Sequence, residues 1–290
     1  MSALDFKDLP ALYRSADRLS SESQSTYLRL VFAEYALLVC CACMTISPIQ
    51  KGWYFLIYTT LFSLALASFI YRYVNKPDQV WYQARALAES IKTLSWKYAM
   101  RADPFDTSDH VAYSDFTRRL HEVLKANEFA GRHFPADWGA EPQVTSKMNQ
   151  IRKSPLLARC DIYQEDRIQN QRNWYASKSG YNKRRARYWS IACALTYGAA
   201  IFSSAVRIDQ PNWTLLPTEP LIALAAGLVG WIQIKKFNEL ASSYILTAHE
   251  IGILHQKVDS SSEQNFSDFV NDAEQAFSRE HTQWVARFGD

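Results

Sequence analysis

The C-terminal tail carries a serine, a glutamate and a histidine at spacings that a hydrolytic site would use. Ser278 comes two residues before the adjacent pair Glu280 and His281, and Trp284 follows three residues later. Apolar residues before them recur at helical spacing, which predicts one amphipathic helix for the tail. Neighbouring side chains on a helix point about 100° apart, so the glutamate and the histidine do not face each other. No strand pattern or glycine-rich turn is present to build an oxyanion hole. The sequence therefore predicts no catalytic residue here, and a protein that is not an enzyme.

Two non-catalytic interpretations of this tail stay open. In the first, His281 and Trp284 pack on the same helical stripe as Glu274, and Glu280 pairs with Arg287 or with a base on an adjoining helix, such as Arg167 or Lys178. A buried pair of that kind specifies an arrangement more than it adds stability. In the second, the helix junction binds a regulatory ligand, and His281 supplies a group that titrates near neutral pH.

Four apolar blocks dominate the chain, although its mean hydropathy is only −0.24. Each block is close to the roughly 20 residues that a bilayer-spanning helix needs. The predicted spans are residues 30–47, 52–73, 188–206 and 215–234. Because the connections within each pair are short, the spans are expected to form two antiparallel hairpins. The predicted fold class is an all-α integral membrane protein with four transmembrane helices and a cytoplasmic helical bundle.

Basic residues flank the spans asymmetrically. A dense cluster at 183–187 precedes the third span and Lys235 and Lys236 follow the fourth, whereas the two hairpin turns carry only Lys51 and Arg207. The positive-inside rule then places both termini and the middle segment in the cytoplasm. The lipid bilayer is thus the expected partner. A formal net charge of +3 is too small to indicate nucleic-acid binding.

No cofactor or metal is predicted. The five cysteines form no Cys/His cluster with zinc spacing, and no phosphate-cradling glycine loop is present. Cysteine in apolar blocks is typical of small buried side chains in a reducing cell.

Each predicted hairpin is followed by a helical pattern, at residues 80–100 and again from residue 237, which indicates a weak internal duplication. Between the two copies, residues 114–130 predict an amphipathic helix. A proline- and glycine-containing stretch up to Pro155 predicts a loop or linker. From residue 156 a polar helix is expected to run directly into the third span.

Small residues four apart are typical of close packing between membrane helices. The pairs are Ala194 with Gly198, Ala223 with Gly227, and Ala226 with Gly230. They indicate that the second hairpin packs against protein, either the first hairpin or another subunit. Glu34 falls near the inner end of the first span, where it lies at the interface or faces a lumen and favours cations.

The entry to the third span and the tail together resemble the SLATT family, bacterial membrane proteins built on a two-helix hairpin. The residues that carry the resemblance are Arg167, Gln171, Trp174, Tyr175, Lys178, Asn182, Glu274, Ser278, Glu280, His281 and Trp284. The N-terminal half is similar to a SLATT unit of another subtype. The expected organisation is one unit at 1–105, a cytoplasmic helix and linker at 106–155, and a second unit at 156–290.

This resemblance implies a multi-pass protein of the bacterial inner membrane, and a pore-forming or membrane-disrupting effector of bacterial conflict systems, including defence against phage. Such proteins are associated with enzymes that make or sense nucleotide signals, so a nucleotide signal or a sensor protein is an expected partner. A four-helix unit encloses little space for water, which favours a homo-oligomer with a gated pore between subunits. The alternative is a non-conducting membrane sensor or scaffold whose cytoplasmic bundle recruits a partner.

Overall fold

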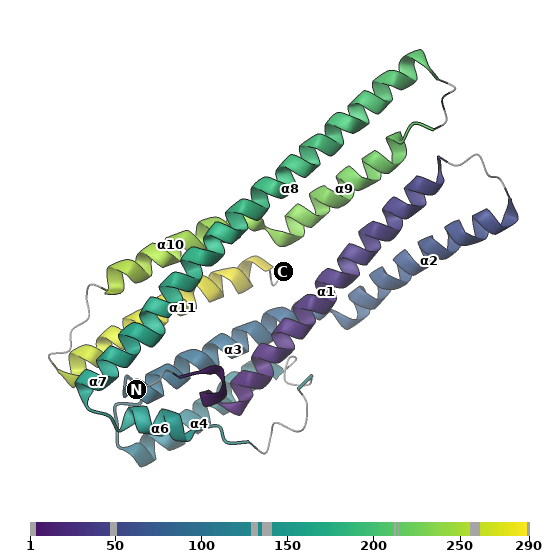
Figure 1. The fold of residues 1–290 in the computed structure, drawn as a ribbon. Helices are drawn as coiled ribbons and strands as arrows, with labels where there is room; N and C mark the ends of the chain where they lie inside the picture. Colours follow the sequence, from purple (N-terminus) through teal and green to yellow (C-terminus); the bar gives the residue numbers. More distant parts are fainter. Residues whose placement is uncertain are drawn as a thin grey trace. The chain divides into compact units, whose positions relative to one another are not determined.

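The computed structural model describes residues 4–46, 51–128, 133–134, 141–211, 213, 215–255 and 262–288; the side chains of residues 255 and 278–288 lie outside what it describes. Within these ranges every regular element is helical and no strand occurs, which confirms the all-α prediction (Figure 1). The elements are η1 (Phe6–Asp8), α1 (Ala11–Met44), α2 (Gly52–Asn75), α3 (Pro77–Met100), α4 (Asp109–Ala126), α6 (Ser146–Arg152), α7 (Leu156–Ile162), η3 (Tyr163–Gln169), α8 (Asn170–Asp209), α9 (Thr218–Lys235), α10 (Phe237–His255) and α11 (Glu263–Phe288).

Four helical stretches in the described residues are long and apolar enough to cross a membrane, as predicted. They contain α1, α2, α8 and α9, which form two hairpins, α1 with α2 and α8 with α9 (Figure 1). The chain is therefore a multi-pass membrane protein with four candidate spans.

The second helix of each hairpin ends at a lysine in the left-handed conformation. Lys76 has φ 43° and donates its backbone N–H to the carbonyl of Arg72, and α3 begins at the next residue. Lys236 has φ 44° and donates to the carbonyl of Ile232, and α10 begins at the next residue. Residues other than glycine rarely adopt this backbone conformation. In both copies of the predicted hairpin-plus-helix pattern, the second span thus ends at a lysine in the left-handed conformation.

The chain divides into two compact units, each assembled from separated segments. We call residues 1–24, 78–178 and 243–290 the bundle unit, and residues 25–77 and 179–242, which hold the spans, the membrane unit. The unit boundaries fall inside the helices α1, α3, α8 and α10. The predicted division at residues 1–105, 106–155 and 156–290 is based on repetition in the sequence, whereas these units are defined by compactness, so that division stays a prediction.

A short helix occupies part of the predicted linker. Thr145 caps α6 by accepting a hydrogen bond on its Oγ1 from the backbone N–H of Met148 at 3.3 Å. With only seven residues, α6 is too short for its apolar periodicity to be recognised. The rest of the predicted loop falls partly on residues 129–132 and 135–140, which lie outside the described ranges.

The core of the bundle unit is apolar and aromatic. Leu87 and Ile91 of α3, Phe116 of α4, and Phe266 and Val270 of α11 are all fully buried. Burying apolar surface is the main favourable contribution to folding. This core positions α3 and α11, which contribute Thr93 and Glu274 to a buried polar site.

Candidate functional site

The bundle unit buries an ion pair between Arg167 of η3 and Glu274 of α11. Only 2% of the Arg167 side chain and none of Glu274 is exposed. The guanidinium Nε donates to Oε1 at 2.8 Å and Nη2 donates to Oε2 at 2.7 Å. Such two-pronged arginine–carboxylate contacts fix geometry as well as supplying energy. We call this pair and its hydrogen-bond partners the Arg167–Glu274 site.

Two hydroxyl groups complete the shell of donors around the carboxylate. Tyr163 donates its phenol to Oε1 at 3.0 Å, and Thr93 of α3 donates its hydroxyl to Oε2 at 2.9 Å. The centre of the Arg167 guanidinium lies 4.7 Å from the ring centroid of Phe277 and 5.9 Å from that of Trp96. The carboxylate therefore accepts four hydrogen bonds, and two aromatic faces flank the guanidinium. Within the described residues, Arg167 Nη1 is buried without a hydrogen-bond acceptor.

Burial and the pair itself shift the acid–base equilibria of the site. Burial raises the pKa of Tyr163 well above its ordinary value, and the neighbouring Glu274 carboxylate raises it further. Burial acts to lower the pKa of Arg167, but attraction to Glu274 outweighs it and the net pKa is raised. Both donors therefore remain protonated across the physiological pH range.

The tyrosine and the arginine of the site both belong to a π-helical segment. η3 spans Tyr163–Gln169 and continues into α8, the helix that holds the third candidate span. π-helical turns are rare and occur frequently at functional sites. The site thus ties the segment that enters α8 to α3 and to α11.

A second cluster holds the aromatic residues predicted on the entry helix. The rings of Trp174 and Tyr175 each lie 5.6 Å from the ring of Tyr244 on α10. Lys178 Nζ lies 5.8 Å from the Trp174 ring, and Gln171 is partly exposed. The structure therefore brings Arg167 and Glu274 together and places Trp174 and Tyr175 against Tyr244 of α10, with Lys178 over the Trp174 ring.

The tail residues that opened the sequence analysis lie in α11, which extends to Phe288. The side chains of Ser278, Glu280, His281 and Trp284 are outside the described residues. Their packing or regulatory role stays a prediction. Arg167, one of the three bases suggested for Glu280, is instead paired with Glu274 of the same predicted stripe.

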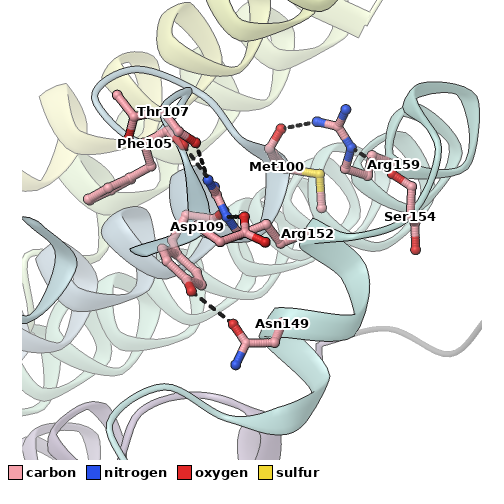
Figure 2. A network of polar contacts seen from close by, with 9 residues as sticks. Met100, Phe105, Thr107, Asp109, Asn149, Arg152, Ser154 and Arg159 are labelled. Atoms are coloured by element: carbon pink, nitrogen blue, oxygen red, sulfur yellow. Dashed lines mark hydrogen bonds and ion pairs between the residues drawn. The ribbon is translucent and has the colours of Figure 1, made fainter. Parts of the chain in front are cut away.

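Sequence reasoning missed a second set of buried arginines, shown in Figure 2. Arg152 is 1% exposed, and its guanidinium donates to the carbonyls of Tyr98, Phe105 and Thr107 at 3.0, 2.8 and 2.8 Å. Its Nε also donates to Asp109 Oδ1 at 2.9 Å. One side chain thereby holds the end of α3 and the loop that follows it.

Arg159 acts in the same way from α7. It is 1% exposed, donates to the carbonyls of Met100 and Ser154, and forms an ion pair with Glu263 of α11. The last carbonyls of a helix lack partners within the helix, and a cation is favourable at that end. Because these acceptors are backbone groups 45 to 59 residues earlier for all but Ser154, no local pattern marks either arginine in the sequence.

The membrane unit joins its two hairpins at a tyrosine. A Cβ atom on Gly230 of α9 would lie 2.4 Å from Tyr35 Oη of α1, and one on Gly227 would lie 3.5 Å from Tyr35 Cβ. Ala223 is partly exposed. At this point the second hairpin packs against the first, one of the two alternatives left open above. By contrast, Ala194 and Gly198 of α8 are exposed.

Glu34 is paired within the membrane unit. Its Oε2 accepts a hydrogen bond from Arg72 Nη2 of α2 at 2.7 Å, and the two side chains are 16% and 21% exposed. An ion pair satisfies both charges in surroundings where an isolated charge is costly. Whether Glu34 lines a lumen stays a prediction.

Comparison with protein-family models gives two tandem matches. The model described as SMODS and SLOG-associating 2TM effector domain 3 matches residues 10–160, and the model described as SMODS and SLOG-associating 2TM effector domain 1 matches residues 163–284. Comparisons with curated proteins and with solved structures found no match. Thr93 lies in the first matched region, whereas Tyr163, Arg167 and Glu274 lie in the second. The Arg167–Glu274 site therefore joins the two regions.

Proposed function

Because the chain belongs to the SLATT family of two-transmembrane effector domains that associate with SMODS and SLOG proteins, we propose that this membrane effector is a homo-oligomer that opens a gated pore in bacterial anti-phage defence. The spans lie in the inner membrane, and the bundle unit and both termini lie in the cytoplasm. The flanking basic residues support that orientation.

The observation that carries the proposal is that the candidate spans leave most of their apolar surface exposed, in a chain with two tandem effector domains. Only 6% to 17% of the apolar window in each candidate span is buried within the chain. The remaining surface is available to lipid and to other subunits. Because the described spans bury so little of their apolar windows within one chain, contacts with other subunits are available to assemble a pore.

Gating is proposed to depend on the Arg167–Glu274 site. Thr93 lies on α3, which follows the second span after Lys76, and Arg167 lies on the segment that precedes the third span. Separating Arg167 from Glu274 would release α11 both from the segment that precedes the third span and from α3, which follows the second span. Movement of these helices then rotates or splays the hairpins, a recognised class of switching transition. The expected trigger is a nucleotide signal or a partner sensor protein that acts on the bundle unit.

Dye release from liposomes tests the proposal. The full chain is reconstituted with an entrapped fluorescent dye, as wild type, as Glu274→Gln, and as the control Glu22→Gln, which alters an exposed ion pair with Arg18. The expected result is a tight wild type, a leaky Glu274→Gln variant and a tight control. If no variant and no activating condition releases dye or dissipates a membrane potential, the pore is excluded and the non-conducting scaffold is favoured.

A further inference from the structure

The membrane unit is strongly basic. Residues 25–77 and 179–242 hold 11 Lys and Arg against 4 Asp and Glu, a formal net charge of +7 in a chain whose total is only +3. Four of these cations, Lys183, Arg184, Arg185 and Arg187, fall within five residues of α8 and all four are exposed. Within the described ranges, two of the unit's four acids are already paired, Glu34 with Arg72 and Glu219 with Arg207.

Basic side chains from two helices lie beside one aromatic contact. Lys235, the last residue of α9, has its Nζ 5.8 Å from the ring of Trp231, and that ring lies 6.2 Å from the ring of Trp189 of α8, four residues after Arg185. Arg185 Nε donates to the Tyr181 hydroxyl at 3.2 Å. Both cations lie over aromatic rings, Arg185 over Tyr181 and Lys235 over Trp231 and Phe237, but no carboxylate among the described residues forms an ion pair with either. A bound anion would supply the missing negative charge.

Aromatic and apolar side chains continue from this basic cluster along α8. The rings of Trp189 and Trp231 lie 6.2 Å apart, and aromatic residues of this kind are typical of the membrane–water interface. Tyr188, Ile191 and Leu195 are 60%, 52% and 69% exposed and share one helical stripe. The cations therefore stand at one end of an exposed apolar strip, an arrangement that suits an acyl chain below a charged headgroup.

We propose that Arg185 and Lys235, surrounded by Lys183, Arg184 and Arg187, bind the phosphate of an anionic phospholipid headgroup. The shared chemistry would also suit a soluble phosphate, but a soluble ion has no use for the apolar strip. Basic residues between helices at a membrane surface bind anionic headgroups, each contributing about fivefold in affinity. This inference goes beyond the proposed pore and depends only on the spans lying in a bilayer.

Electron paramagnetic resonance with spin-labelled lipids tests the assignment. The full chain is reconstituted in phosphatidylcholine bilayers with trace spin-labelled phosphatidylglycerol or phosphatidylcholine, and the ratio of their association constants is measured. Wild type should prefer phosphatidylglycerol. The double variant Arg185→Gln/Lys235→Gln should lose up to about 30-fold of that preference. The control Lys51→Gln/Lys76→Gln removes the same charge from exposed positions elsewhere in the unit and should keep it.

Each outcome decides the proposal. If the double variant keeps the wild-type preference, or if the control loses as much as the double variant, the site is wrong. Inorganic phosphate added at constant ionic strength provides a further arm; if it displaces phosphatidylglycerol, the occupant is a soluble phosphate and the lipid assignment falls. If the double variant does not fold, Arg185→Gln alone should lose about fivefold and Arg185→Lys should retain most of the preference. The readout needs no conduction, so it stands or falls separately from the pore.

Discussion

Replacing Glu274 with glutamine gives the sharpest test of the buried pair. The four described hydrogen bonds to the carboxylate all come from donors, namely two nitrogens of Arg167 and the hydroxyls of Thr93 and Tyr163. Glutamine has nearly the same shape but turns one acceptor oxygen into a donor. Whichever way the amide is oriented, two of these donors then face another N–H group, and the charge of Arg167 is left without its partner.

The expected loss is large because both side chains are almost completely withdrawn from water. Removing one member of a buried ion pair costs about 3–5 kcal/mol. For a domain of 150–250 residues each kcal/mol lowers the melting temperature by about 2–4 °C. Glu274→Gln should therefore lower the melting temperature of the bundle unit by roughly 6–20 °C. Replacing both partners with apolar residues, Arg167→Met with Glu274→Leu, should recover much of the loss, because no charge is then left buried.

Melting is followed by near-ultraviolet circular dichroism of the full chain in detergent, since aromatic rings surround the site. Glu22→Gln again serves as control, because its ion pair with Arg18 is exposed and pairs of that kind contribute little. If Glu274→Gln melts with the wild type and the control, the pair does not stabilise the bundle unit. The gating role proposed for it would then be untenable.

Three further predictions concern other parts of the chain. Arg152→Lys leaves buried carbonyls without donors, so it should destabilise the bundle unit by about 2–3 kcal/mol and speed amide exchange at residues 101–108. Unchanged exchange there would show that Arg152 does not hold this loop. Gly230→Ala forces Tyr35 to move and should cost about 1–3 kcal/mol in unfolding of the membrane unit, whereas Gly198→Ala, with open space at its Cβ, should cost little; equal costs would refute the close contact. Burial raises the pKa of Cys160 to about 11, so its neutral thiol stabilises the fold fully below about pH 9 and that contribution is lost as the pH rises to about 11. Unfolding free energy across that window should fall more steeply for wild type than for Cys160→Ala, and parallel curves would count against the burial argument.

The spans and their order were predictable because they depend on length, apolar content and flanking charge, which are local properties of sequence. The helix after each hairpin was predictable for the same reason. Arg167 and Glu274 were both singled out by resemblance, but their pairing was not. Which carboxylate meets the arginine depends on the register between α11 and η3, and neither segment carries a local pattern that specifies it.

The contacts of Arg152 and Arg159 could not be predicted from the sequence, for a different physical reason. The main acceptors of Arg152 and Arg159 are backbone carbonyls, which every residue carries, so no side-chain type identifies them. The short helix α6 that presents Arg152 shows too few turns for periodicity. Only the three-dimensional path of residues 98–107 reveals why those arginines are buried.

The position of Glu274 late in the chain has a consequence for how the protein is made. Arg167 precedes its partner by 107 residues, and all four candidate spans precede α11. Synthesis runs from the N-terminus, so the spans leave the ribosome while the arginine still lacks its carboxylate. In the proposed mechanism each new chain therefore passes through a state in which Arg167 is not yet paired with Glu274, until α11 is synthesised and packs in place. A ribosome that stalls between the fourth span and α11 would leave an effector that has never been switched off.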